Sequence, residues 1–166
     1  MVRLCVHSLR NLAYYRAWYE EGKPHATRNF WVNANGNFIE IALLEWCKVF
    51  GDRKGAYNYK KCVDDPDAVH GLLLAAIGKS QQQWDDYVDA MRKYRDKFVA
   101  HWDEDVDGAF LPEMDIAKDS LVFLLDHCVQ KEGEDSFQWD DVPQPALLFY
   151  EQRLADGRGA CRATYK

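Results

Sequence analysis

Apolar residues recur at helical spacing along most of this chain, whereas the alternating pattern of a half-buried strand is scarce. Six segments carry the helical pattern, and glycine, proline or a capping residue bounds most of them. The segments cover residues 3–21, 28–50, 65–78, 80–102, 113–131 and 144–155. Helices without a sheet must bury their apolar stripes against one another. The sequence therefore predicts an all-α, up-and-down bundle of about five to six helices.

Short capping signals mark the start of two of these helices. Asp65-Pro66 combines an N-cap residue with proline at the first helical position. Ser80 followed three residues later by Gln83 matches a capping box, in which side chain and backbone satisfy each other's hydrogen bonds. Both signals predict that a helix begins at the next residue.

The length of 166 residues suits one domain, which we expect over residues 1–157, followed by a flexible tail over residues 158–166. The formal net charge of −6 excludes binding of nucleic acid through bulk positive charge, so an RNA contact must be local. No apolar run approaches the ~18 residues of a membrane span, and no signal peptide or cofactor motif is recognised.

The five scattered cysteines contain no Cys-x-x-Cys pair and fit free thiols in a reducing cytosol. We expect a cytoplasmic protein that does not bind membranes.

Two polar residues interrupt the apolar stripe of the helix over residues 80–102. Arg95 lies mid-stripe, between Val88 and Trp102, and His101 lies at the edge of the stripe near the helix end. A guanidinium cannot lose its charge, so Arg95 must find a carboxylate or a phosphate. Taken singly, the two residues indicate a structural ion pair and a half-buried histidine.

The helix over residues 28–50 is apolar nearly all round, which is typical of a central helix. Asn33, Asn37 and Glu40 nevertheless form one polar line at positions i, i+4 and i+7. Two interpretations remain open. The line is either an exposed strip or a polar seam that faces Arg95, in which Glu40 or an asparagine holds the guanidinium.

The stretch Tyr-Arg-Asp-Lys-Phe-Val-Ala-His-Trp-Asp, residues 94–103, resembles the signature of the HEPN superfamily, especially of its abortive-infection branch. The pattern of that family is an arginine, a polar residue and, several residues later, a histidine on a late helix of an α-bundle. Arg95, Asp96 and His101 match this pattern. The order of the helices and the long apolar second helix extend the similarity over most of the chain.

The resemblance implies a bacterial or phage defence protein, or a member of a toxin–antitoxin pair, that acts as a metal-independent endoribonuclease. In such an enzyme a ribose 2′-OH attacks its own phosphodiester, imidazole serves as general acid or base, and guanidinium stabilises the transition state. These roles fall on His101 and Arg95. Asp96 would orient the arginine or a partner group, and Lys97 would touch phosphate.

The resemblance also implies a homodimer, because the arginine and histidine of such enzymes usually meet at a dimer interface. Helix geometry agrees, since residues six apart point about 120° apart on a regular helix. Arg95 and His101 of one chain therefore converge only if the helix deforms, if Arg95 reaches around it, or if two chains pair their motifs about a two-fold axis. RNA and a cognate antitoxin are the further partners implied.

Two alternatives stand beside the ribonuclease. Many members of the family are thought to be partners or scaffolds, so the chain is alternatively a non-catalytic helical interaction module. The acidic run Asp103, Asp105, Asp107 and Gly108 also matches the first half of a calcium-binding loop. Position 12 of that loop is Met114 rather than glutamate, and no Cys or His spacing suits zinc, so we expect no metal.

The polar loop over residues 51–64 is the most basic surface candidate of the chain. Interleaved cations and aromatic rings of this kind can guide and stack single-stranded RNA. The simpler interpretation is a solvated loop. The residues concerned are Arg53, Lys54, Tyr57, Tyr59, Lys60 and Lys61.

Overall fold

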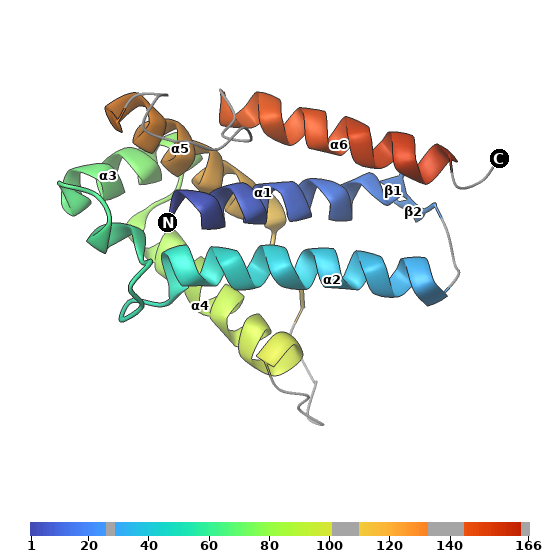
Figure 1. Ribbon diagram of the computed structural model, residues 1–166. Helices are drawn as coiled ribbons and strands as arrows, with labels where there is room; N and C mark the ends of the chain where they lie inside the picture. The colour runs from blue at the N-terminus through green and yellow to red at the C-terminus, as the bar shows by residue number, and fades with distance from the viewer. Residues whose placement is uncertain (26–28, 101–109, 133–144, 164–166) are drawn as a thin grey trace.

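The computed structural model describes residues 1–25, 29–100, 110–132 and 145–163 (Figure 1). Within these ranges the protein is mostly helical, which confirms the predicted all-α class. None of the helices described there is long and apolar enough to cross a membrane. The six α-helices of the described residues are α1 (Val2–Ala17), α2 (Asn29–Trp46), α3 (Pro66–Ile77), α4 (Gln81–Tyr94), α5 (Met114–Glu132) and α6 (Ala146–Ala163).

The predicted capping signals are confirmed as hydrogen bonds. The Asp65 carboxylate accepts from the backbone N–H of Ala68 at 3.1 Å and begins α3. At the start of α4, the Ser80 hydroxyl accepts from the Gln83 N–H at 3.2 Å, and the Gln83 side chain accepts from the Ser80 N–H at 2.9 Å. Each cap satisfies backbone donors that the first turn of a helix leaves unpaired.

A small antiparallel hairpin follows α1, where the sequence predicts helix as far as Glu21. Strands β1 (Tyr19–Glu20) and β2 (Lys23–Pro24) pair across a two-residue turn. Both turn residues have positive φ, 51° at Glu21 and 76° at Gly22. A tight turn of this kind needs left-handed residues, which glycine adopts without strain. The first helix therefore ends at Ala17, earlier than predicted.

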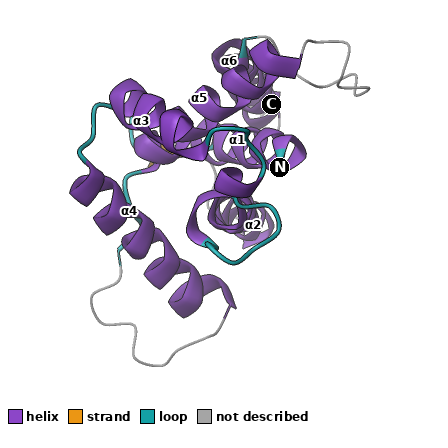
Figure 2. Cartoon of the chain, turned by 90° about the vertical axis from the view of Figure 1, so that its left-hand side faces the viewer, coloured by secondary structure: helices purple, strands orange, loops and turns teal. Residues whose placement is uncertain are grey.

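Helix α1 is the central helix, and it packs against α2 on one side and α6 on the other (Figure 1). It also contacts α5, and its apolar residues Leu9, Leu12 and Ala13 are completely buried. Figure 2 views α1, α2 and α6 end-on and shows α3 and α4 together to one side of them. The expectation that the second helix is central is wrong, because α2 leaves large apolar side chains such as Phe30 (72% exposed) and Val32 (48%) in solvent.

Trp46 joins three helices at the C-terminal end of α2. Its ring is fully buried and lies 5.0 Å from the ring centroid of Phe50, 5.9 Å from that of Trp84 and 5.5 Å from that of Tyr87. The indole N–H donates to the Ser120 hydroxyl of α5 at 3.0 Å. This one side chain therefore fixes α4 and α5 against α2.

Helix α6 differs from the prediction in both length and packing. It continues to Ala163, so residues 158–163 are helical rather than part of a separate tail. Glycines at 157 and 159 indicate a helix end in the sequence, yet Gly157 lies against α1. A Cβ atom at Gly157 would meet the Cβ of Ala17 at 2.6 Å. The missing side chain therefore serves close helix packing and not termination.

Replacement of Gly157 by alanine tests this close approach. Gly157→Ala should lower the free energy of unfolding by about 1–3 kcal/mol, because α6 must move away from α1 to admit the methyl group. Gly159→Ala is the matched control in the same helix, where an added Cβ meets no described heavy atom within 4 Å. It should stabilise the protein by about 0.5–1 kcal/mol through helix propensity. If urea unfolding showed that both substitutions stabilise the protein, or that both destabilise it, the close packing of Gly157 against α1 would be contradicted.

Candidate functional site

Arg95 lies where α4 passes into a π-helical segment, Arg95–Ala100. It follows Met91 by one helical turn, so it continues the stripe that α4 buries beside Trp46. The Arg95 Nη1 atom lies 2.5 Å from the Asp52 carboxylate, and Nε donates to the Asp96 carboxylate at 2.8 Å. The predicted mid-stripe arginine thus has carboxylate partners, one of them from the loop that follows α2.

The two carboxylates keep the Arg95 guanidinium firmly protonated. Its side chain is only 16% exposed, and this burial by itself would lower its pKa. The hydrogen bonds to Asp96 and Asp52 outweigh burial, so the pKa of Arg95 is raised above its ordinary value. The result is a permanent cation held in one orientation.

The hypothesis that Glu40 or an asparagine of α2 holds this guanidinium is replaced by the Asp52 pair. Asn33, Asn37 and Glu40 are all exposed, as in the alternative of an exposed strip. Glu40 remains close to the motif, since burial and then the charge of Glu40 raise the pKa of Tyr94, the residue before Arg95. Asp52 itself carries no sequence signal, because nothing in the local pattern pairs it with a residue on another helix.

Of the other three motif residues, the structure describes Asp96 and Lys97. Asp96 is exposed and Lys97 is partly buried. His101 lies outside the described residues, as do Asp103, Asp105 and Asp107 of the calcium hypothesis. Met114, at position 12 of that hypothetical loop, begins α5 and is buried in the core. Within the described part of the chain, no three His, Cys, Asp or Glu side chains gather closely enough to hold a metal ion.

The basic loop over residues 52–61 lies beside α4 and is pinned to the core by Tyr59. The Tyr59 ring is 2% exposed and packs 5.3 Å from the Phe50 ring. Its predicted role in stacking RNA bases is therefore wrong, because a ring without exposed faces cannot stack on a ligand. Tyr57, which is 56% exposed, is the aromatic ring that this loop presents to solvent.

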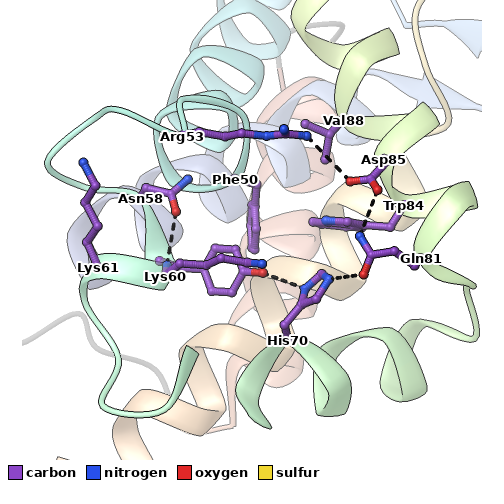
Figure 3. A pocket seen from close by; sticks show the side chains of 11 residues that line it. Phe50, Arg53, Asn58, Lys60, Lys61, His70, Gln81, Trp84, Asp85 and Val88 are labelled. Atoms are coloured by element: carbon purple, nitrogen blue, oxygen red, sulfur yellow. Dashed lines mark hydrogen bonds and ion pairs between the residues drawn. The ribbon is translucent and has the colours of Figure 1, made fainter. Parts of the chain in front are cut away.

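A directional chain of hydrogen bonds links Tyr59 to α4 (Figure 3). Gln81 Nε2 donates to the Asp85 carboxylate at 2.9 Å, which leaves Gln81 Oε1 to accept from His70 Nε2 at 2.7 Å. With its proton on Nε2, His70 has a lone pair on Nδ1, and this atom accepts from the Tyr59 hydroxyl at 2.7 Å. The Asp85 carboxylate can only accept from Gln81, and this fixes the direction of the hydrogen bonds from Gln81 through His70 to Tyr59 of the loop.

Two hollows adjoin this loop, and Arg53 lines both. The first has a volume of about 460 Å³ and lies over the hydrogen-bond chain, with Lys60 and Lys61 among its lining residues (Figure 3). The second, of about 680 Å³, lies between the loop and α4 and includes Lys54 and Arg92. The Arg53 guanidinium lies 3.7 Å from Asp85, and its side chain is 69% exposed.

This face, which we call the loop–α4 face, is formed by residues 52–61 together with Asp85, Arg92 and Arg95. Five of its cations reach solvent, and its acidic side chains are Asp52, paired with Arg95, and Asp85, near Arg53. Its positive charge is therefore local, as an RNA contact on an acidic protein requires. The exposed cations are Arg53, Lys54, Lys60 and Lys61 of the loop and the partly exposed Arg92 of α4.

The sequence identified Arg95 and the loop cations of this face but missed Arg92, His70, Gln81 and Asp85. The capping box places Gln81 at the start of α4, but it gives no sign of the His70 partner on α3. All five cysteines are free, as predicted. Comparison of the chain with protein-family models, with curated proteins and with solved structures finds no match.

Removal of the Asp52 carboxylate tests the ion pair that joins the loop after α2 to Arg95. Asp52→Ala should lower the free energy of unfolding by about 1–2 kcal/mol, because a mostly buried guanidinium loses a charged hydrogen bond. The control is Asp89→Ala, which removes a 3.5 Å ion pair with Arg92 between exposed side chains. It should cost less than about 0.5 kcal/mol. Equal costs in urea unfolding would show that Arg95 does not depend on Asp52.

The hydrogen-bond chain makes a separate prediction for two tyrosines of one loop. Tyr59→Phe leaves His70 Nδ1 buried without its donor and should cost about 1–2 kcal/mol of stability. Tyr57→Phe removes the same hydroxyl from an exposed ring and should change stability by less than about 0.5 kcal/mol. Thermal and urea unfolding of the two variants measure the difference. A Tyr59→Phe protein as stable as the wild type would refute the proposed direction of these hydrogen bonds.

Proposed function

We propose that this chain is a HEPN-like, metal-independent endoribonuclease of bacterial or phage defence that binds single-stranded RNA on the loop–α4 face. One observation supports the proposal above all. The Asp52–Arg95 ion pair brings together two features that the sequence indicates separately, the Arg95 motif and the basic loop. RNA held by the loop cations would then pass directly beside the arginine of the motif.

The chemistry follows from the residue types of the motif. The ribose 2′-oxygen attacks the adjacent phosphorus as its proton passes to a base, and the bond from phosphorus to the 5′-oxygen breaks as that oxygen gains a proton. His101 serves as the general acid or base of these transfers. Arg95 stabilises the extra negative charge on the phosphate oxygens. Its guanidinium has five N–H groups, more than the described bonds to Asp52 and Asp96 use.

The proposal includes a symmetric homodimer, in which the Arg95 of one copy and the His101 of the other form each site. A cognate antitoxin is the protein partner that such an enzyme requires in its own cell. The free cysteines fit a reducing cytoplasm, where such an enzyme would meet RNA.

A second candidate is a non-catalytic helical interaction module, and the surroundings of Arg95 favour it. The guanidinium is mostly buried and lies between two carboxylates, which offset its charge before any phosphate arrives. In this alternative Arg95 fastens the loop to α4, and the loop–α4 face binds a protein.

Substitution of the two motif residues separates the two candidates. Arg95→Ala and His101→Ala should each lower the rate of RNA cleavage by at least about 100-fold, because each removes charge stabilisation or proton transfer from the transition state. A chelator should leave the wild-type rate unchanged. The measurement is cleavage of a labelled single-stranded RNA, with circular dichroism to show that each variant is folded.

Mixing the two inactive variants tests the dimeric site. If the arginine and histidine of a site come from different copies, random pairing restores one good site in each mixed dimer, and about a quarter of the wild-type activity returns. Sedimentation should show a dimer. Wild-type protein without cleavage activity, or a folded His101→Ala protein that cleaves at the wild-type rate, would overturn the ribonuclease in favour of the interaction module.

A further inference from the structure

A separate pocket lies at the hairpin end of the molecule. It has a volume of about 320 Å³ and is lined by residues of α2 and α6 and by the C-terminal end of α1, which lies between these two helices (Figure 1). This volume falls at the lower end of the range of small-molecule sites. The pocket shares no lining residue with the hollows of the loop–α4 face.

Four aromatic rings line this pocket. Trp18 and Trp31 lie with ring centroids 6.2 Å apart, and Tyr14 and Phe38 lie with centroids 5.5 Å apart. All four line the pocket. Aromatic walls favour a planar aromatic guest, which can stack on one ring and meet another edge-on. A flexible aliphatic guest would use this geometry less well.

Asn35 is the buried polar residue in this lining. On α2 it lies four residues after Trp31 and three before Phe38, so it occupies the same helix face. Its residue exposure is 5%, and its side-chain oxygen Oδ1 is buried with no hydrogen-bond partner among the described residues. A buried oxygen without a donor is costly in a native protein. An N–H or O–H group from a guest would satisfy it.

The pocket also indicates the charge of its guest. The lining contains one ionised side chain, Asp156, and an Arg153 nitrogen lies 3.3 Å from that carboxylate. Neither an anion nor a cation would therefore find an unpaired opposite charge in the lining. A neutral molecule loses least on entering such a site.

We propose that this pocket binds a small, neutral, planar aromatic molecule that carries one N–H or O–H donor, of the indole or phenol class, and that Asn35 accepts from this donor. The proposal does not depend on ribonuclease activity. It also explains why α2 is apolar nearly all round without being central, because one face of its N-terminal half lines a binding pocket.

The test is a titration of the full chain with indole and with 1-methylindole, which has the same ring but no donor. The observable is the set of indole N–H signals of the tryptophans in nitrogen–proton NMR spectra. Signals of Trp18 and Trp31 should shift and saturate with indole, while that of Trp46, which is bonded to Ser120 in the core, should stay in place. The dissociation constant for 1-methylindole should be at least about tenfold higher.

Two variants assign the donor preference to Asn35. Asn35→Leu keeps the size of the side chain without its oxygen, so indole and 1-methylindole should bind with affinities within about twofold of each other. Asn33→Leu, at an exposed position of the same helix, is the control and should keep the tenfold preference. Ala34→Phe places a ring at the pocket wall and should abolish binding of both molecules.

The proposal is overturned by any of three results. These are no saturable shift with millimolar indole, equal affinity of wild type for both molecules, and an indole preference that survives in folded Asn35→Leu protein. If Asn35→Leu does not fold, as judged by circular dichroism, Ala34→Phe decides. Indole binding that persists in folded Ala34→Phe protein would then place the ligand elsewhere.

Discussion

The placement of Trp46 is the constraint on which the rest of this structure depends. Its ring is buried among aromatic side chains of the segment after α2 and of α4, and its N–H is satisfied by Ser120 of α5. A buried indole must keep such a donor paired, so the three helices cannot slide past one another without loss. The π-helical segment Cys47–Gly51 follows directly, and it places Asp52 beside Arg95, which continues the buried stripe of α4.

The loop after α2 is consequently held at both ends. Asp52 pairs with Arg95, and Tyr59 is bonded through His70 and Gln81 to Asp85. Between these anchors the backbone is constrained, while the side chains of Lys54 and Tyr57 remain in solvent. A basic loop on a rigid base suits recognition of a polyanion, since less conformational entropy is lost on binding. The same two anchors would equally support an interface with a protein.

Helix α2 combines two environments along one helix. Its C-terminal half is core, with Leu43 and Trp46 completely buried. Its N-terminal half carries Trp31, Asn35 and Phe38 on the face that lines the aromatic pocket, and it exposes Phe30 to solvent. An apolar pattern all round a helix therefore arises here from a pocket and an exposed apolar surface, and not from complete burial.

The sequence by itself determined the helical class, the starts of α3 and α4 and the basic character of the loop. These features depend on residues a few positions apart, such as Asp65 with Ala68 and Ser80 with Gln83, whose contacts any local helix would make. Only the tertiary structure decided that Arg95 pairs with Asp52 instead of Glu40 and that Tyr59 is buried. It also decided that α6 continues past Gly157, where it packs closely against α1. The physical reason is sequence distance. A side chain's partner on another helix is selected by how the helices pack, and that packing is a property of the whole core rather than of any local pattern.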